Sequence, residues 1–400
     1  MAADKIVDGI WSVGVLNPNL RVFDIVMATD YGTSYNSFLV KAQKTALIET
    51  CHHRYFDFFT ANIEQQCPLD QLDYIVLNHC EPDHSGALER LIERAPQAQI
   101  IASQAGSIYL KNITNKADLK IRVVKNGDTV DLGGKTLTFI PAPFLHWPDS
   151  MFTYVQEDKV LFPCDFLGAH FCEPQLFDTR MVYEKRYESA FRGYYDAIFG
   201  PFKPYVLAGL EKIKDLELEI VCPSHGPVLT KNGRINAAKE KYFTWSQPHH
   251  NAVKTIPVFY TTAYGNTQRV AEAIREGILE SIPTAAVSLY DLVEQDMGAM
   301  HAALNGSDAF AVGSPTINRD AVPPIWTLLA GVDAINNQKK PALAFGSYGW
   351  SGEAVPSIIG RMNALKLSVF GEGLKVCFVP SAEDLEKART MGREFAKALA

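Results

Sequence analysis

The chain has few cysteines and does not pair them. Seven cysteines are scattered along the sequence, and none belongs to a CxxC pair. The sequence therefore offers no disulfide framework and no cysteine-ligated zinc or iron knuckle. We expect reduced and mostly buried thiols, as in a protein of the cytoplasm.

Long apolar runs and an excess of positive charge are also lacking. No stretch approaches the roughly 20 apolar residues that a membrane-spanning helix needs, and the first residues contain no apolar core of a signal peptide. The formal net charge is −7 at pH 7, which leaves no basic face for nucleic acid. We expect a cytoplasmic protein that binds neither membranes nor nucleic acid.

The 400 residues exceed one ordinary core, so we expect two domains. Up to about Tyr242, short apolar runs such as DYIVLN alternate with turns and a few helices, which predicts sheets with helices packed outside. After a polar stretch that contains Pro248, strands and helices alternate regularly. That order predicts a doubly wound parallel sheet of five strands. We place the domains at residues 1–250 and 254–400.

The segment NHCEPDHSG, residues 78–86, holds two histidines and two carboxylates within six positions. Pro82 favours an extended backbone at the residue before it. Alternate side chains of an extended segment share one side, so we expect His79, Glu81 and Asp83 to point the same way. His84 should join them where the following helix begins.

Three more polar residues, His146, Asp165 and His225, each follow an apolar strand. Layered α/β folds bind ligands at that end of their strands. Any one of them alone is better explained as a strand-end residue bonded to nearby backbone. Together with the hexapeptide they favour a metal site. The candidate ligands are His79, Glu81, Asp83, His84, His146, Asp165 and His225.

A second candidate site lies in YTTAYGNTQRVAEAI, where a buried strand meets a helix. Thr261, Thr262 and Thr267 offer hydroxyls, Gly265 permits close backbone approach, and the free amides of the helix suit an anion. The loop therefore predicts a phosphate cradle. It fits neither the GK[ST] loop nor GxGxxG, which disfavours ATP and NAD.

The order HxExDH, followed by His, Asp and His, resembles the metallo-β-lactamase pattern with Glu81 in place of its second histidine. That replacement is typical of flavodiiron proteins, and the resemblance covers the whole chain. It implies an α/β fold, with a metallo-β-lactamase-like αββα sandwich followed by a flavodoxin-like doubly wound parallel sheet. It also implies that His79, Glu81 and His146 bind one iron. Asp83, His84 and His225 would bind the other, with Asp165 bridging them.

The phosphate cradle resembles that of flavodoxins, which bind flavin mononucleotide (FMN), and two later strand ends match the same family. Tyr348 and Trp350 would contact or stack on the flavin ring, although core packing is the alternative for Trp350. The resemblance implies FMN contacts at Thr261, Thr262, Ala263, Tyr264, Gly265, Asn266, Thr267, Ser314, Pro315, Thr316, Ile317, Asn318, Ser347, Tyr348, Gly349, Trp350, Ser351 and Gly352.

The family resemblance implies an oxidoreductase that detoxifies dioxygen, nitric oxide or both. A flavin and a diferrous pair together hold the four electrons that turn dioxygen into water, whereas joining two nitric oxide molecules into nitrous oxide needs only two. Tyr194 and Tyr195 are candidates for proton delivery. A zinc hydrolase fused to a flavodoxin-like domain is the alternative, although it would usually keep histidine at position 81.

The resemblance also implies partners. Flavin and iron crevices of consecutive domains commonly lie far apart, so the family pattern predicts a head-to-tail homodimer or a dimer of dimers. No rubredoxin module with paired CxxC motifs follows Ala400. We therefore expect the minimal form of the family, with a separate rubredoxin-like protein as electron donor.

Overall fold

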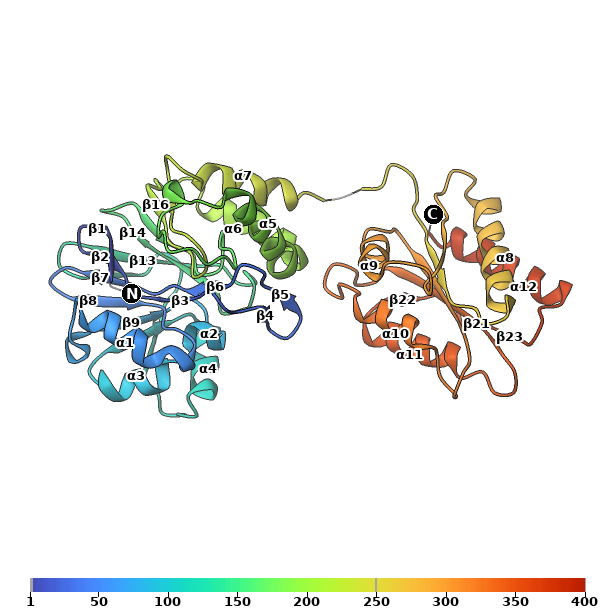
Figure 1. The fold of residues 1–400 in the computed structure, drawn as a ribbon, viewed down its shortest axis with the longest axis horizontal. Helices are drawn as coiled ribbons and strands as arrows, with labels where there is room; N and C mark the ends of the chain where they lie inside the picture. Colours follow the sequence, from blue (N-terminus) through green and yellow to red (C-terminus); the bar gives the residue numbers. More distant parts are fainter. Residues whose placement is uncertain (1–2, 249, 400) are drawn as a thin grey trace. The chain divides into compact units, whose positions relative to one another are not determined.

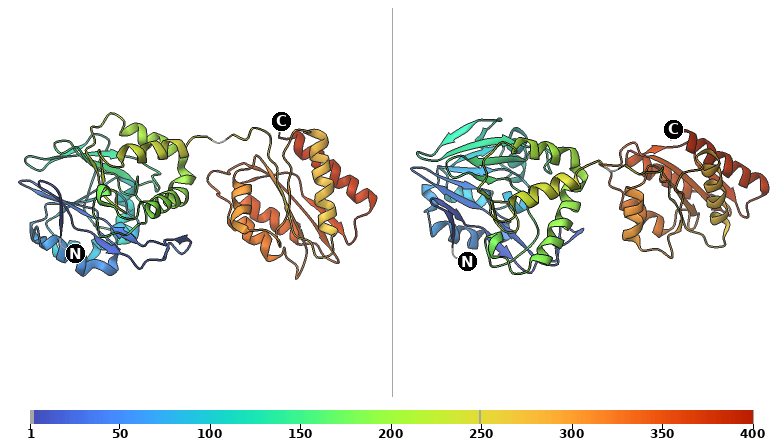
Figure 2. Two further views of the ribbon diagram at one scale, coloured as in Figure 1. Left: turned by 45° about the horizontal axis from the view of Figure 1, so that its top comes forward. Right: turned by 90° about the horizontal axis from the view of Figure 1, so that it is seen from above.

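The computed structural model describes residues 3–248 and 250–399. The chain forms two compact units, Met1–Gln247 and Pro248–Ala400, drawn in blue to yellow-green and in yellow to red (Figures 1 and 2). Each unit is described by itself below.

The first unit is built on two sheets that face each other. In the first sheet, β8 (Thr45–Ile48) pairs antiparallel with β7 (Phe38–Lys41) and parallel with β9 (Tyr74–Leu77). The first sheet has the order β1 (Asp4–Val7), β2 (Ile10–Ser12), β7 (Phe38–Lys41), β8 (Thr45–Ile48), β9 (Tyr74–Leu77), β10 (Gln99–Ala102) and β11 (Ile121–Val123). The second has the order β12 (Thr129–Asp131), β13 (Thr136–Pro141), β14 (Met151–Val155), β15 (Val160–Phe162), β16 (Ile220–Val221) and β17 (Leu229–Thr230).

Helices cover the outer face of each sheet, which gives four layers (Figure 1). The first sheet carries α1 (Phe56–Glu64), α2 (Pro82–Ser85), α3 (Leu88–Arg94) and α4 (Gln104–Ile113); the second carries α5 (Glu184–Tyr194), α6 (Lys203–Lys212) and α7 (Ile235–Trp245). Two hairpins lie beside the sheets, β3 (Val15–Asn17) with β6 (Thr33–Tyr35), and β4 (Val22–Phe23) with β5 (Met27–Ala28).

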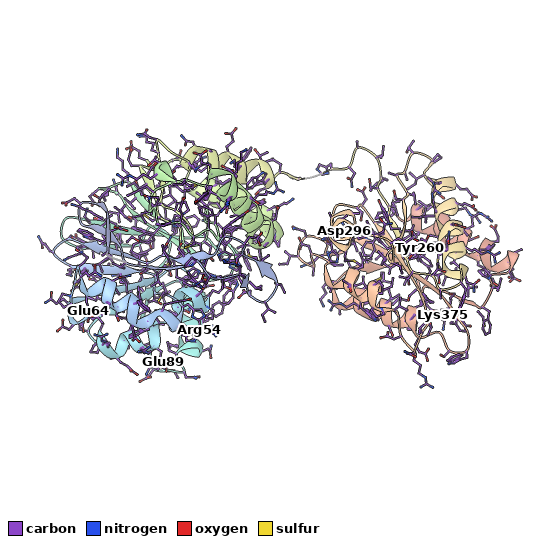
Figure 3. The ribbon with its side chains drawn as sticks, viewed as in Figure 1. Arg54, Glu64, Glu89, Tyr260, Asp296 and Lys375 are labelled. Atoms are coloured by element: carbon purple, nitrogen blue, oxygen red, sulfur yellow. The ribbon has the colours of Figure 1, made fainter. Side chains whose placement is uncertain are left out.

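Alternation along the strands builds the core between these layers. In β8, Leu47 packs toward the helices, whereas its neighbours Ala46 and Ile48 pack toward the second sheet. Successive strand residues point to opposite faces, so one strand serves two apolar layers. Charged residues such as Glu64 and Glu89 lie on the exposed side of the helices (Figure 3).

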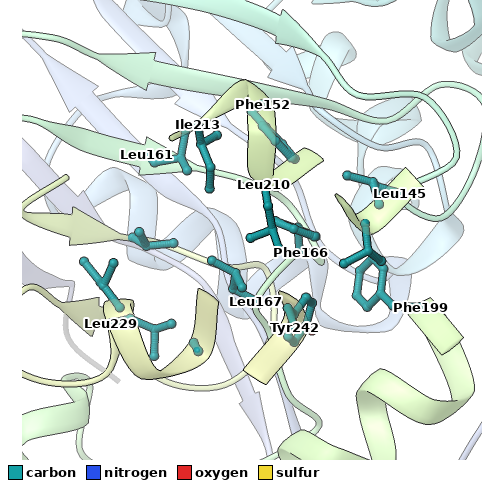
Figure 4. Close-up of a cluster of buried hydrophobic side chains, with 14 of the residues drawn as sticks. Leu145, Phe152, Leu161, Phe166, Leu167, Phe199, Leu210, Ile213, Leu229 and Tyr242 are labelled. Carbon is teal, nitrogen blue, oxygen red and sulfur yellow. The ribbon is translucent and has the colours of Figure 1, made fainter. Parts of the chain in front are cut away.

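A third apolar layer lies between the second sheet and α5 to α7. Phe152 and Leu161 on the strands meet Phe199 and Tyr242 from the helical side, with Phe166 between them (Figure 4). All five side chains except Tyr242 are fully apolar, and each is essentially inaccessible. This rigid layer supports the loop that carries Asp165.

The second unit is a parallel sheet covered on both faces. Its order is β19 (Leu289–Asp291), β18 (Val258–Tyr260), β20 (Phe310–Pro315), β21 (Pro341–Tyr348) and β22 (Ser368–Val369), with β23 (Leu374–Cys377) also paired to β21. Helices α8 (Asn266–Ser281) and α12 (Ala382–Lys397) share one core layer with the sheet, while α9 (Met297–Asn305), α10 (Pro323–Ala330) and α11 (Ala354–Ala364) share the other.

Two details differ from the sequence-based expectations. The segment expected to stay extended through Asp83 turns helical at Pro82, where α2 begins, because proline has its preferred backbone angle at a first helical position. The second unit also has the extra two-residue strand β22 beside the five expected strands. Among the described residues, the helices are all too short or too polar to span a bilayer.

Candidate metal centre and flavin site

The seven predicted ligands lie together at the ends of four strands. His79 follows β9, His146 lies in the loop after β13, Asp165 follows β15, and His225 follows β16. All seven residues are buried or nearly so. The structure therefore brings these separate strand ends together in one pocket, as expected from the sequence.

Helix α2 delivers Asp83 and His84. Glu81 remains extended, with φ −57° and ψ 143°, and Pro82 opens the helix. The backbone N–H and the hydroxyl of Thr50 both donate to the carbonyl of His84. The turn that begins at Pro82 is thus fixed near its end by Thr50, which follows β8.

The first cluster contains His79, Glu81, His146 and Asp165. Glu81 Oε2 lies 3.3 Å from His79 Nε2 and 3.1 Å from His146 Nε2. The Oδ2 atom of Asp165 lies 3.7 Å from His79 Nε2 and 3.5 Å from His146 Nε2. Two imidazoles and two carboxylates therefore converge.

The second cluster contains Asp83, His84 and His225. Asp83 lies 3.3 Å from His84 Nε2 through Oδ1 and 3.1 Å from His225 Nε2 through Oδ2. The Oδ1 atom of Asp165 lies 3.1 Å from His84 Nε2 and 3.4 Å from His225 Nε2. Asp165 thus directs one oxygen at each cluster.

Several atoms of this pocket make no hydrogen bond among the described residues. They are both carboxylate oxygens of Asp83, Oδ1 of Asp165 and Nε2 of His84. Buried polar atoms are normally satisfied, so these atoms require another partner. Mixed imidazole and carboxylate ligands suit divalent iron, and three carboxylates balance much of the charge of two such ions. The donor set fits a pair of cations.

The electrostatics agree with that fit. Burial alone would lower the pKa of His84, but the charges of Asp83 and Asp165 raise it to about 10. Burial opposes ionisation of Asp165, yet the neighbouring histidines hold its pKa well below the usual range. The pocket favours positive charge beside its carboxylates, and bound metal ions would take the place of those protons.

Three residues around the pocket, Glu49, Asp24 and Thr33, were missed in the sequence. Burial raises the pKa of Glu49 to about 8, and burial with a hydrogen bond to Glu81 raises that of Asp24 to about 6. Thr33 Oγ1 lies 2.8 Å from Nδ1 of His170. These residues come from distant strands and turns, and only a buried polar residue inside an apolar run, such as Glu49, gave a sequence signal.

Aromatic rings line the pocket. Phe23 packs on His170 at 4.4 Å between ring centroids, and Tyr194 lies 6.0 Å from His225. A hollow of about 440 Å³, lined by Tyr109, Phe144, His146, Trp147, Pro148 and Phe202, reaches His146 from outside. The hydroxyl of Tyr195 instead pairs with Ser246 at 2.7 Å, so the two tyrosines named as proton donors occupy different surroundings.

The predicted phosphate cradle follows β18. Thr261 Oγ1 and Thr262 Oγ1 are buried and make no hydrogen bond among the described residues. Gly265 precedes α8 with φ +80°, and a Cβ added there would meet no atom within 4 Å. Unpaired hydroxyls and free helical amides beside open space fit a phosphate group.

The other two predicted flavin loops follow β20 and β21, the next strands in the sheet. Thr316 donates its N–H to the carbonyl of Ser347 at 2.8 Å, and Thr267 Oγ1 lies 2.8 Å from Ser347 Oγ. These contacts join the three loops. The Ser314 hydroxyl is occupied within the chain, since it donates to the Pro315 carbonyl.

Two aromatic side chains at these loops are exposed. Tyr264 is 92% exposed and Trp350 is 88% exposed, which rules out core packing as the explanation of Trp350. Free aromatic faces next to a phosphate cradle suit a flat ring system. The remaining predicted flavin residues lie on the same three loops, at the ends of β20 and β21, or at the start of α8.

Comparisons with known proteins agree with both sites. The family model described as "ODP family beta lactamase" matches residues 33–226, and the one described as "Flavodoxin" matches residues 258–392. Flavo-diiron protein FprA2 of Clostridium acetobutylicum is 53% identical over 400 residues, covering 100% of both chains. A nitric oxide reductase of Moorella thermoacetica is 35% identical, covering 99% of this chain and 98% of the relative.

Solved structures give the same answer. Rubredoxin oxygen:oxidoreductase of Desulfovibrio gigas has a TM-score of 0.72 and 30% identity, covering 99% of this chain and 98% of that one. The flavodiiron protein of Giardia intestinalis has a TM-score of 0.70 and 29% identity, covering 100% and 97%. The sequence, the fold and the two sites therefore agree that this chain belongs to the flavodiiron protein family.

Proposed function

We propose that the two clusters hold the two irons of a flavodiiron centre. His79, Glu81 and His146 would bind one ion, and Asp83, His84 and His225 the other. Asp165 would bridge them, because its two oxygens point to different clusters. That placement of one carboxylate between two sets of ligands is the observation that carries the proposal.

As a flavodiiron protein, the chain is an oxidoreductase with FMN and a non-haem diiron centre, and it reduces dioxygen, nitric oxide or both. When bound, the flavin supplies electrons and the irons supply open positions for a diatomic gas. The side chains fix those positions, and the aromatic rings around the ligands exclude water. The hollow beside His146 offers an apolar way in.

We infer that the unit Met1–Gln247 is the diiron domain and that Pro248–Ala400 is the FMN domain. The three loops joined through Ser347 would hold the flavin. Thr261, Thr262 and the amides at the start of α8 would bind its phosphate, and Trp350 would cover its ring. The unpaired hydroxyls of the cradle support this assignment.

We also propose a head-to-tail homodimer, or a dimer of dimers, in which the flavin of one subunit serves the irons of its partner. Exposed apolar side chains near both sites support it. Ile25 and Val26, in the turn after Phe23, are 94% and 88% exposed. Tyr264 and Trp350 are exposed at the flavin loops, and exposed apolar groups of this kind favour burial in an interface.

The electron donor in this proposal is a separate rubredoxin-like protein, and the name of the Desulfovibrio gigas relative supports that choice. We further propose a cytoplasmic location. All seven cysteines are free, including exposed Cys377, and unpaired thiols suit a reducing compartment.

The test is metal and flavin analysis of the wild type and of Asp165→Ala. We expect two irons and one FMN per wild-type chain, and loss of iron with full FMN in the variant. Asp178→Ala, which removes a buried carboxylate away from the clusters, is the control and should keep its iron. Zinc in the wild type, with ready ester or lactone hydrolysis, would favour the zinc hydrolase instead.

A further inference from the structure

A buried carboxylate outside the seven proposed ligands lies directly behind the first cluster. Asp149, in the loop between β13 and β14, is 1% exposed. Its Oδ2 atom lies 3.2 Å from His79 Nδ1 and accepts the backbone N–H of Cys80 at 2.7 Å. The hydroxyl of Ser103, at the start of α4, donates to the Asp149 carbonyl at 2.7 Å. The His79–Cys80 segment thus holds the carboxylate, and Ser103 holds the backbone of the same residue.

The contact determines which nitrogen of His79 carries the proton. A carboxylate oxygen can only accept, so Nδ1 of His79 must donate to Asp149. In the neutral imidazole the lone pair is then on Nε2, and this atom faces Glu81 and Asp165. Asp149 therefore presents His79 to the first cluster in the form that can bind a metal ion.

In the second cluster, His225 is held by neutral groups instead. Nδ1 of His225 lies 2.6 Å from the carbonyl oxygen of Ser34 and 3.3 Å from the hydroxyl of Thr33. His79 is thus supported by a full negative charge and His225 by neutral dipoles. Glu49 also lies near His84, with ligand atoms within 4.8 Å, but its Oε1 accepts from the N–H of Asn78 and its Oε2 makes no hydrogen bond among the described residues. A charge behind an imidazole makes it a stronger ligand than a neutral partner does.

We propose that Asp149 is a positioning residue that sets the tautomer of His79 and makes the first cluster the tighter of the two metal positions. The inference rests on the proposed function, because it takes His79 and His225 as ligands of different ions. It goes further in stating that the two positions differ in metal affinity and that Asp149 causes the difference.

The test is Asp149→Asn. An asparagine oxygen can still accept from His79 and Cys80, while its NH₂ group replaces Oδ1, which makes no hydrogen bond among the described residues. The variant therefore removes charge and keeps shape. Metal-free protein is titrated with Co²⁺ against a chelator. We expect two binding steps in the wild type. In the variant, the affinity of the tighter step should fall about 10- to 100-fold, while the affinity of the weaker step and the FMN content stay unchanged.

Asp178→Asn is the matched control, since it also neutralises a buried carboxylate that accepts backbone N–H groups, those of Thr230 and Arg234. It should leave both steps unchanged. Unchanged binding in Asp149→Asn, or equal loss of both steps, would overturn the inference alone. A wild type that binds no metal ion would overturn the proposed function.

A second measurement needs no variant. In ¹⁵N-histidine NMR spectra of the wild type loaded with Zn²⁺, we expect His79 to bind metal through Nε2 and to keep a proton on Nδ1. A His79 that binds through Nδ1 would contradict the role of Asp149, even if Asp149→Asn fails to fold.

Discussion

At the scale of single residues, the pocket contains buried carboxylate oxygens whose hydrogen-bonding capacity the chain leaves unused. Asp83 and Asp165 are buried, and three of their four carboxylate oxygens make no hydrogen bond among the described residues. A buried carboxylate with unsatisfied oxygens is costly even when imidazoles lie beside it. Ion binding should therefore stabilise the first unit as well as equip it for chemistry.

The exposed ring of Trp350 gives a prediction for flavin binding. Trp350→Ala should weaken FMN binding about fivefold, because stacking against an aromatic ring contributes roughly 1 kcal/mol. Iron content should not change. FMN fluorescence titration of the flavin-free protein measures the affinity, with Phe243→Ala, which removes a half-exposed ring from α7, as the control. Equal loss of iron and flavin would indicate misfolding.

Lys340 gives a prediction for pH dependence. Burial lowers its pKa from 10.5 to about 8, although its ammonium group donates to the carbonyls of Leu304 and Asn305. Between these pH values the unfolded chain holds the proton and the folded chain does not. The free energy of unfolding therefore gains a contribution that rises from about pH 8 to pH 10.5.

Urea unfolding of the wild type and Lys340→Met across that pH range measures this contribution. The variant loses two hydrogen bonds at every pH, so the informative quantity is the slope. We expect the difference in stability between wild type and variant to change only above about pH 8. A constant difference would show that the amine titrates normally.

The seven candidate ligands could be predicted because they form a compact motif and follow apolar strands. Asp149 could not, because it acts through a contact formed only on folding. Asp149 lies 70 positions from His79 in sequence, and no local pattern encodes such a pairing. At Pro82 two local rules oppose each other. Side-chain alternation favours an extended backbone through Asp83, whereas proline favours the first position of a helix, and the helix forms.

At the scale of elements, two glycines determine how α8 and α12 cross. A Cβ on Gly277 would lie 1.9 Å from the carbonyl oxygen of Arg389, and one on Gly392 would lie 2.2 Å from that of Ile274. The helices approach so closely because neither carries a side chain at the crossing. Arg389 and Arg393 then reach Glu276 and Glu280 across the outer side.

Gly277→Ala should therefore destabilise the second unit by about 3 kcal/mol, since the backbone of α12 must move. Gly360→Ala is the matched control. That glycine lies in α11 with no atom within 4 Å of an added Cβ, so alanine there should stabilise by up to about 1 kcal/mol. Urea unfolding of both full-length variants provides the comparison, and similar effects would show that the crossing tolerates separation.

The fold class was accessible from the sequence because alternation and helical periodicity are local. The faces of β21 show the pattern, with Ala344 in one core layer and Phe345 in the other. The strand β22 was missed because two residues carry too little periodicity to be distinguished from a turn.

At the scale of the whole molecule, the proposed dimer predicts that two inactive subunits restore one another. Asp165→Ala should remove iron but keep flavin. Gly265→Asp should remove flavin but keep iron, because the new carboxylate repels phosphate and the side chain strains a backbone with φ +80° in the cradle. In a head-to-tail dimer, the flavin of the first variant meets the irons of the second.

Co-expression of the two variants with different tags tests this arrangement. Random assortment gives mixed dimers with one working pair of sites, so the pool should recover about a quarter of wild-type gas consumption. Each variant alone should be inactive. A pool as inactive as its parts would mean that electrons pass within one chain, and that the proposed arrangement is wrong.

The division of the chain into two consecutive units has a consequence for biosynthesis. The last side chain of the proposed metal pocket, His225, precedes the first flavin loop at Thr261. Domains generally fold as units, beginning with the amino-terminal one during translation. The metal pocket can therefore close while the ribosome is still making the flavin-binding sheet, so that each cofactor is acquired at its own stage of maturation.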